Sequence, residues 1–159
     1  MSRRTISANV RNKLMNTFSS YEIFKDTRLQ AEASRQNDQR PHEVFYFHKV
    51  DDPYSHLTIQ SIKKLQTSYD IKLRPVLVGG ESLEALHEPT LYNHYCLQDV
   101  QRIAPFYGIE FQAKSYPTKE LVSLANSILS AVNDQNFVDI ATQVSSALWR
   151  GDSVTLDEI

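Results

Sequence analysis

The amino-acid sequence predicts an α/β domain built on one strand–helix–strand (βαβ) unit that is followed by several helices. Two short runs rich in β-branched and aromatic residues, 43–47 and 71–78, are typical of strands. A helical apolar repeat lies between them. Because two strands joined through a helix pair in parallel, we expect a parallel pair with a right-handed crossover. The later helices leave the predicted domain with a small sheet and many helices.

A separate N-terminal helix and polar linker are expected over residues 1–40, before the α/β domain of residues 41–159. Residues 1–21 are basic without acids, which is typical of a transit peptide or of an amphipathic helix. Residues 25–40 are polar and form either a solvated continuation of that helix or a linker. The helix is favoured because apolar residues share one helical face, at Val10, Leu14, Phe18, Tyr21, Ile23 and Phe24.

The first predicted strand, residues 43–47, is so rich in apolar side chains that we expect a central strand buried on both faces. A polar loop, residues 48–52, follows it. Asp52 and Pro53 then match the N-cap and the first position of a helix. The apolar spacing extends this helix to about Tyr69.

The second predicted strand, residues 71–78, contains Pro75, which lacks an amide donor and belongs at a sheet edge or a bulge. Gly79 and Gly80 close this strand. Since a two-stranded sheet is poorly stable alone, we expect further strands from a continuation of the chain or from a partner chain. Helical spacing then recurs over residues 90–107, 118–133 and 136–149, and a last helix starts near Ser153.

Composition excludes several classes of function. The 159 residues carry a net charge of −2, so no global field attracts nucleic acid or an anionic membrane. No apolar stretch approaches the roughly 20 residues that cross a bilayer. The single cysteine, Cys96, excludes a CxxC pair and a multi-cysteine zinc site and fits the reducing cytoplasm. Cys96 is either a reactive thiol or a small residue that packs a helix.

The histidines show no metal-ligand spacing, so no metal site is predicted. Two of them, His48 and His56, flank the polar loop. These two either take part in proton transfer or are half-exposed loop and helix residues. The five histidines are His42, His48, His56, His87 and His94.

Several segments follow one another in the order of a known pattern. They are the strand, loop and helix Phe45–Leu57, the strand and glycine turn Arg74–Gly80, the helix Tyr95–Ala104, the turns Tyr107–Ile109 and Tyr116–Pro117, and the helix end Ala147–Asp152. Together they resemble the 2-hydroxychromene-2-carboxylate isomerase and kappa-class glutathione transferase family, which belongs to the DsbA-like branch of thioredoxin folds. The resemblance covers residues 43–159 and implies an incomplete thioredoxin-like βαβ unit with a helical insertion subdomain and an extra N-terminal amphipathic helix. It also implies that the chain is the N-terminal portion of a longer protein.

The resemblance places Asp52 where that family has its Ser or Cys nucleophile. The unpaired amides and the dipole of the following helix favour an anion there, which the kappa class uses for the glutathione sulfur. The resemblance therefore implies a glutathione-dependent isomerase or transferase that acts on a small-molecule substrate. The implied catalytic residues are Asp52, Tyr54 and Ser55, and the implied substrate-binding residues are Pro53, His48 and His56.

A second interpretation follows from the departures from the family pattern. An Asp52 carboxylate would cap the helix itself and repel a thiolate, which argues against thiol–disulfide exchange. Leu86-His87-Glu88 stands where the family has Thr-Gly-Asn, so polar contacts to glutathione are lost. The alternative is a non-catalytic thioredoxin-like binding or scaffold domain. In both cases the sheet edge and the N-terminal helix predict a homodimer, or packing on a further domain of the intact protein.

Overall fold

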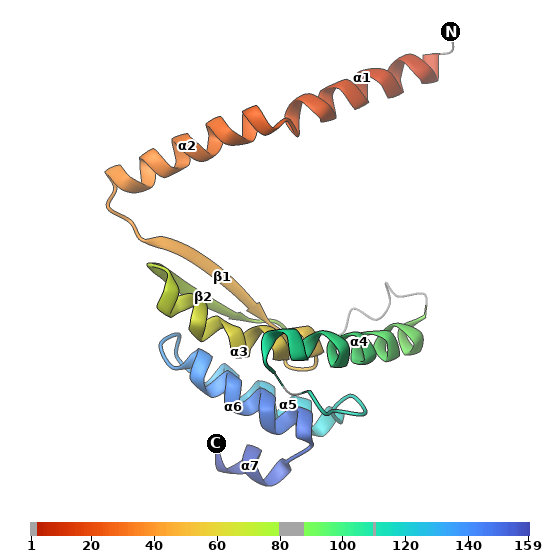
Figure 1. The fold of residues 1–159 in the computed structure, drawn as a ribbon, viewed down its shortest axis with the longest axis vertical. Coiled ribbons are helices and arrows are strands. Elements are labelled where there is room, and N and C mark those ends of the chain that lie inside the picture. The colour runs from red at the N-terminus through yellow and green to blue at the C-terminus, as the bar shows by residue number, and fades with distance from the viewer. Residues whose placement is uncertain (1–2, 80–87, 110) are drawn as a thin grey trace. The chain divides into compact units, whose positions relative to one another are not determined.

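The computed structural model describes residues 3–79, 88–109 and 111–159 (Figure 1). The chain divides into two compact units, Met1–His42 and Glu43–Ile159. None of the helices in the described ranges combines the length and the apolar composition that a bilayer crossing requires. The elements are α1 (Arg3–Phe18), α2 (Tyr21–Asn37), β1 (His42–His48), α3 (Pro53–Ser68), β2 (Ile71–Leu77), α4 (Pro89–Ile103), the 3₁₀ helix η2 (Ala104–Tyr107), α5 (Lys119–Ser130), α6 (Phe137–Arg150) and α7 (Ser153–Glu158).

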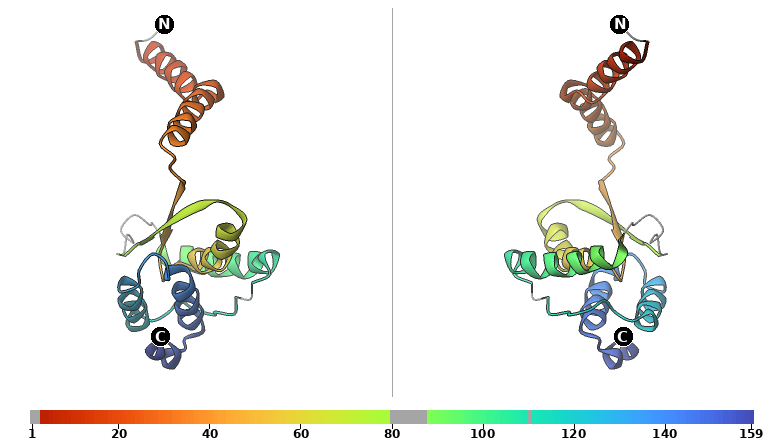
Figure 2. Two further views of the ribbon diagram at one scale, coloured as in Figure 1. Left: turned by 90° about the vertical axis from the view of Figure 1, so that its left-hand side faces the viewer. Right: turned by 90° about the vertical axis from the view of Figure 1, so that its right-hand side faces the viewer.

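The first unit contains two consecutive helices, α1 and α2, where the apolar spacing predicts one helix through Phe24. The chain changes direction between them (Figure 2). Ser20 is the N-cap of α2, and its hydroxyl accepts a hydrogen bond from the backbone N–H of Ile23 at 3.5 Å. The hydroxyl of Ser19 donates to the Met15 carbonyl oxygen at 2.7 Å. Two adjacent serines that bond the backbone therefore end one helix and start the next.

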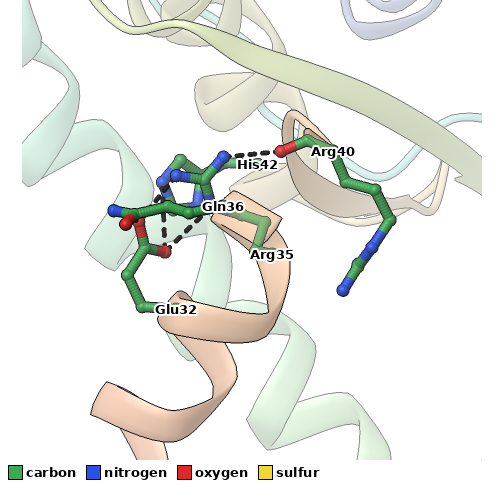
Figure 3. Close-up of polar contacts among 5 residues, drawn as sticks. All are labelled: Glu32, Arg35, Gln36, Arg40 and His42. Atoms are coloured by element: carbon green, nitrogen blue, oxygen red, sulfur yellow. Dashed lines mark hydrogen bonds and ion pairs between the residues drawn. The ribbon is translucent and has the colours of Figure 1, made fainter. Parts of the chain in front are cut away.

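The polar segment after residue 25 continues as helix α2 to Asn37, which confirms the helical alternative for most of that segment. A network of polar side chains holds its end (Figure 3). Arg35 donates to both carboxylate oxygens of Glu32, at 2.6 and 2.8 Å, and to the Arg40 carbonyl oxygen. Gln36 donates to Glu32 at 2.8 Å, and His42 lies 3.7 Å from the same carboxylate. The hydrogen bond from Arg35 is the main cause that lowers the pKa of Glu32 to about 2.

The second unit contains the predicted βαβ unit. Strands β1 and β2 are parallel neighbours and are joined through α3. The backbone N–H of Val78 donates to the His48 carbonyl oxygen at 2.8 Å, next to the end of both strands. Among the described residues β2 pairs with β1 alone and is therefore an edge strand. An edge strand is a position that tolerates Pro75, which has no backbone N–H to donate.

Strand β1 is not buried on both faces, contrary to the prediction. Its burial alternates, with Tyr46 and His48 buried and with Phe45 and Phe47 each 61% exposed. Successive side chains of a strand point to opposite faces, so a sheet covered on one side leaves every second residue in water. Both faces of β1 carry apolar side chains that could be buried. Among the described residues, however, other elements cover only the face of Tyr46 and His48.

Helix α3 packs against the sheet on one side and against α4 and α6 on others (Figure 1). Its Ile59 and Ile62 join the larger core, which also contains residues of β1, β2, α5 and α6. Its Leu57 joins a second core with residues of α4 and with Trp149 of α6. Helix α6 therefore contributes to both cores and holds the helical part against the βαβ unit.

The predicted later helices are confirmed as α4 with η2, α5, α6 and α7. Thr118 caps α5 through a hydrogen bond from the Leu121 N–H at 3.4 Å. Gly151 ends α6 with a φ of 70°, a conformation that favours glycine. Helix α7 packs on α5 and α6 (Figures 1 and 2). The predicted turn residue Gly80 and the family positions Leu86 and His87 lie outside the described residues.

Candidate functional site

The amino end of α3 carries the residues that the family resemblance assigns to catalysis. Asp52 is the N-cap, and its Oδ2 accepts a hydrogen bond from the Ser55 backbone N–H at 2.7 Å. Pro53, which is buried, takes the first helical position. The predicted cap is therefore confirmed. The carboxylate sits where the helix amides favour negative charge, and it uses one of those amides itself.

Ser55 ties the loop between β1 and α3 to the helix. Its hydroxyl oxygen accepts a hydrogen bond from the Lys49 backbone N–H at 3.3 Å. Its carbonyl oxygen accepts a hydrogen bond from the Tyr46 hydroxyl at 3.2 Å. Lys49 also lies 3.1 Å from the Asp51 carboxylate within the same loop. The Ser55 groups thus hold the loop in place, next to the Asp52 cap.

Tyr54 joins α3 to α4. Its hydroxyl donates a hydrogen bond to Oδ2 of Asp99 at 2.8 Å. Burial, followed by this hydrogen bond, raises the pKa of Tyr54 above its ordinary value. Sequence reasoning did not assign Asp99 to the site, although Asp99 lies in the helix pattern that carries the resemblance.

Cys96 is buried on α4 among tyrosines from three segments. A hydrogen bond with Cys96 is the main cause that raises the pKa of Tyr92, and a further one contributes to the raised pKa of Tyr54. Burial raises the pKa of Tyr116, and the nearby Cys96 and Asp52 add to this shift. The region beside Asp52 therefore brings together phenols from α3, from α4 and from the segment before α5. The burial of Cys96, with 3% exposure, matches its interpretation as a packing residue.

His48 is the last residue of β1 and is fully buried, so its interpretation as a half-exposed loop residue is wrong. Its Nδ1 lies 2.9 Å from the Tyr46 hydroxyl, and its Nε2 lies 3.3 Å from Oγ of Ser145 on α6. Burial lowers the pKa of His48 to about 4, although Asp52 opposes this shift. His48 is thus a neutral bridge between the sheet and α6. A serine on the otherwise apolar face of α6 was the available sequence signal for Ser145.

His56 is also buried, contrary to its interpretation as half-exposed. Its ring packs 5.6 Å from the Phe111 ring and 6.2 Å from the Trp149 ring, between centroids. Its Nε2 lies 3.0 Å from the side-chain nitrogen of Gln60. Burial is the main cause that lowers the pKa of His56 to about 4. Of the predicted site residues, Asp52, Pro53, Tyr54, Ser55 and His56 all lie at the amino end of α3. His48 is connected to this helix end through the Tyr46 hydroxyl, which contacts His48 Nδ1 and the Ser55 carbonyl oxygen.

The residues at this helix end do not fit a glutathione thiolate. An incoming sulfur anion would meet the Asp52 carboxylate, and the Ser55 amide already donates to that carboxylate. Within the described ranges, no three His, Cys, Asp or Glu residues are grouped so that they could hold a metal ion. His87, one of the five histidines considered, lies outside those ranges.

Comparisons of this chain with protein-family models, with curated proteins and with solved structures found no match. The resemblance to the isomerase and transferase family therefore rests on the ordered sequence segments alone. The geometry at Asp52 has to be interpreted from its own contacts.

Proposed function

We propose that this chain is a thioredoxin-like binding or scaffold domain, related to 2-hydroxychromene-2-carboxylate isomerase and without thiol redox chemistry. The single observation that supports this is the hydrogen bond from the Ser55 N–H to the Asp52 carboxylate. A bound thiolate needs free amides and no competing anion at that place. The contacts of the other two proposed catalytic residues are structural, since Ser55 closes the loop and Tyr54 joins α3 to α4.

The second candidate function is a glutathione-dependent isomerase or transferase acting on a small-molecule substrate. The tyrosines around Cys96 favour it, because they bring phenol groups from distant segments to the neighbourhood of Asp52. In this proposal Asp52 acts as a base or orients the substrate, with Tyr54 and Ser55 beside it and with contacts from Pro53, His48 and His56. The Tyr54 hydroxyl already donates to Asp99 and Tyr92 already bonds Cys96, so the phenol that would donate a hydrogen bond to such a substrate is Tyr116.

Calorimetric titration with glutathione separates the two functions. The binding-domain proposal predicts no heat at millimolar glutathione for the wild type, and measurable binding for Asp52→Ser, which removes the charge and keeps a capping oxygen. Asp52→Asn also removes the charge, with little change in size. If the charge is what excludes glutathione, this variant should bind it as well. Binding to the wild type that Asp52→Ala abolishes would instead support the enzyme.

The partner that we propose for the first unit is a second copy of this chain. Its apolar residues are largely exposed, including Leu14, Phe18 and Leu29. Helix α1 carries four basic residues and no acid, whereas α2 contains three acids, Glu22, Asp26 and Glu32, which alternate with three basic residues, Lys25, Arg28 and Arg35. An antiparallel pair of two copies would place the basic helix of each beside the acidic residues of the other. The competing occupant is a different folded domain.

A further inference from the structure

Two buried ring nitrogens in the second unit have no hydrogen-bond partner among the described residues. They are Nδ1 of His56 and Nε1 of Trp149. His56 is 5% exposed and Trp149 is 6% exposed, so both side chains are more than nine-tenths buried. A buried polar group without a partner is expensive and is rare in folded proteins. Two of them in ring contact therefore call for a physical explanation.

Both nitrogens are hydrogen-bond donors. The indole Nε1–H of Trp149 can only donate. For His56 the neighbouring Gln60 identifies the tautomer. The amide nitrogen of Gln60 donates to the His56 carbonyl oxygen at 3.1 Å and lies 3.0 Å from Nε2 of the same residue. Nε2 therefore accepts, and the neutral ring carries its proton on Nδ1.

The two donors lie in one aromatic cluster. The ring centroids of His56 and Trp149 are 6.2 Å apart, and Phe111 lies 5.6 Å from the first and 5.4 Å from the second. Tyr116 packs edge-on against Trp149 at 5.6 Å. The cluster joins α3, α6 and the segment between η2 and α5. An apolar setting of this kind strengthens a hydrogen bond to any acceptor that enters it.

The charged groups around His56 favour an anionic acceptor. Arg150 follows Trp149 on α6, and its positive charge opposes protonation of His56, after the larger effect of burial. The other titratable group that acts on His56 is His48 of β1, which is neutral at pH 7. A negatively charged oxygen would accept from both N–H groups. Arg150, which also lies 3.9 Å from the Asp152 carboxylate, would add a weaker attraction.

We propose that His56 Nδ1–H and Trp149 Nε1–H together bind a small carboxylate. His56 lies in the first turn of α3, but its ring packs against Phe111 and Trp149, so this proposal does not depend on whether glutathione binds at Asp52. Neither ring needs to move a proton, since both donors are present at neutral pH. The competing occupant is an ordered water molecule, which would satisfy the same donors without any ligand.

Nuclear magnetic resonance of the ¹⁵N-labelled full chain tests the proposal, because Trp149 is the only tryptophan and gives one indole N–H signal. The probe is acetate, with acetamide at the same concentration as the uncharged comparison and with sodium chloride at equal ionic strength. We expect acetate to shift the indole signal saturably and to raise the pKa of His56 from about 4. Acetamide should bind at least about tenfold more weakly, and chloride should not shift the signal.

Variants separate ligand binding from structural effects. His56→Leu removes one donor and should weaken acetate binding about tenfold, whereas His56→Asn keeps an N–H near the Nδ1 position and should restore most of it. His94→Gln, at an exposed histidine of α4, is the matched control and should leave binding unchanged. The proposal is overturned if acetate leaves the indole signal unchanged, or if acetate shifts it equally in the wild type and in His56→Leu. Either result would leave a buried water as the partner.

Discussion

The carboxylate of Asp52 accepts the backbone N–H of Ser55 at 2.7 Å and so closes the amino end of α3 with a negative charge belonging to the chain itself. The same helix end, in a thioredoxin-type enzyme, stabilises a thiolate. In this protein the positive end of the helix dipole therefore faces the carboxylate of Asp52. This hydrogen bond has measurable consequences for the stability of the fold.

Removal of this cap should destabilise the second unit. Asp52→Ala deletes the acceptor of the Ser55 N–H, and we expect the free energy of unfolding in urea to fall by about 1 kcal/mol. Asp52→Ser keeps an acceptor at the same position and should lose much less. Equal losses in the two variants would show that the hydrogen bond to Ser55 does not stabilise the helix start.

The two buried histidines should make the protein acid-sensitive. Folding lowers the pKa of His48 and of His56 to about 4, from an ordinary value near 6.5. Between these values the unfolded chain binds more protons, so the free energy of unfolding falls as the pH drops from 6.5 toward 4. Urea unfolding at pH 7 and pH 5 should differ by roughly 2 kcal/mol for each histidine.

Single variants apportion this acid sensitivity. His48→Gln and His56→Gln should each remove about half of the difference between pH 7 and pH 5, if both histidines act. His94→Gln, at an exposed position of α4, should leave the difference unchanged. A pH profile that neither buried variant alters would mean that other groups cause the acid response.

The hydrogen bond between Tyr54 and Asp99 should contribute to the packing of α3 on α4. Tyr54→Phe removes the hydroxyl that donates to Asp99 at 2.8 Å and should reduce the free energy of unfolding by about 1 kcal/mol. Tyr95→Phe, at an exposed tyrosine of α4, is the control. A double-mutant cycle with Asp99→Asn checks the pairing, because independent effects of the two changes would contradict a direct interaction.

Self-association through the first unit should respond to its apolar face. Phe18 is 67% exposed in the single chain, and Phe18→Glu places a charge on that face. We expect sedimentation equilibrium to show a dimer for the wild type and a shift toward monomer for Phe18→Glu. Thr17→Glu adds the same charge one position away and should have a smaller effect. A wild type that stays monomeric at high concentration contradicts the dimer.

Much of the fold could be predicted from the sequence because local signals and tertiary packing agree. The spacing of apolar residues located α3 to α6, and Asp52 with Pro53 marked the start of α3 correctly. The break at Ser19–Ser20 was missed because the apolar spacing runs across it, while two hydroxyl groups compete for the backbone. The exposed Phe45 and Phe47 were missed because apolar density shows what a strand can bury and does not show what covers it.

The candidate site was predictable only where its residues are close in the sequence. Asp52, Tyr54 and Ser55 lie together because they fall within four successive residues of the N-cap and the first turn of α3. The partnerships of Tyr54 with Asp99 and of His48 with Ser145 join residues far apart in the chain, so they depend on helix packing. The burial of both histidines likewise reflects tertiary contacts, and for His48 the polar character of residues 48–52 concealed it.

The position of Asp52 as an anion site is tested most directly by Asp52→Cys in a Cys96→Ala background, where the introduced thiol is the only one. Its ionisation is followed by the ultraviolet absorbance of the thiolate against pH, with the folded chain compared with the urea-unfolded chain. We expect a folded-state pKa below about 7 for the introduced thiol, because the helix amides then stabilise a sulfur anion. A folded-state value near about 8.5, equal to that of the unfolded chain, would contradict it.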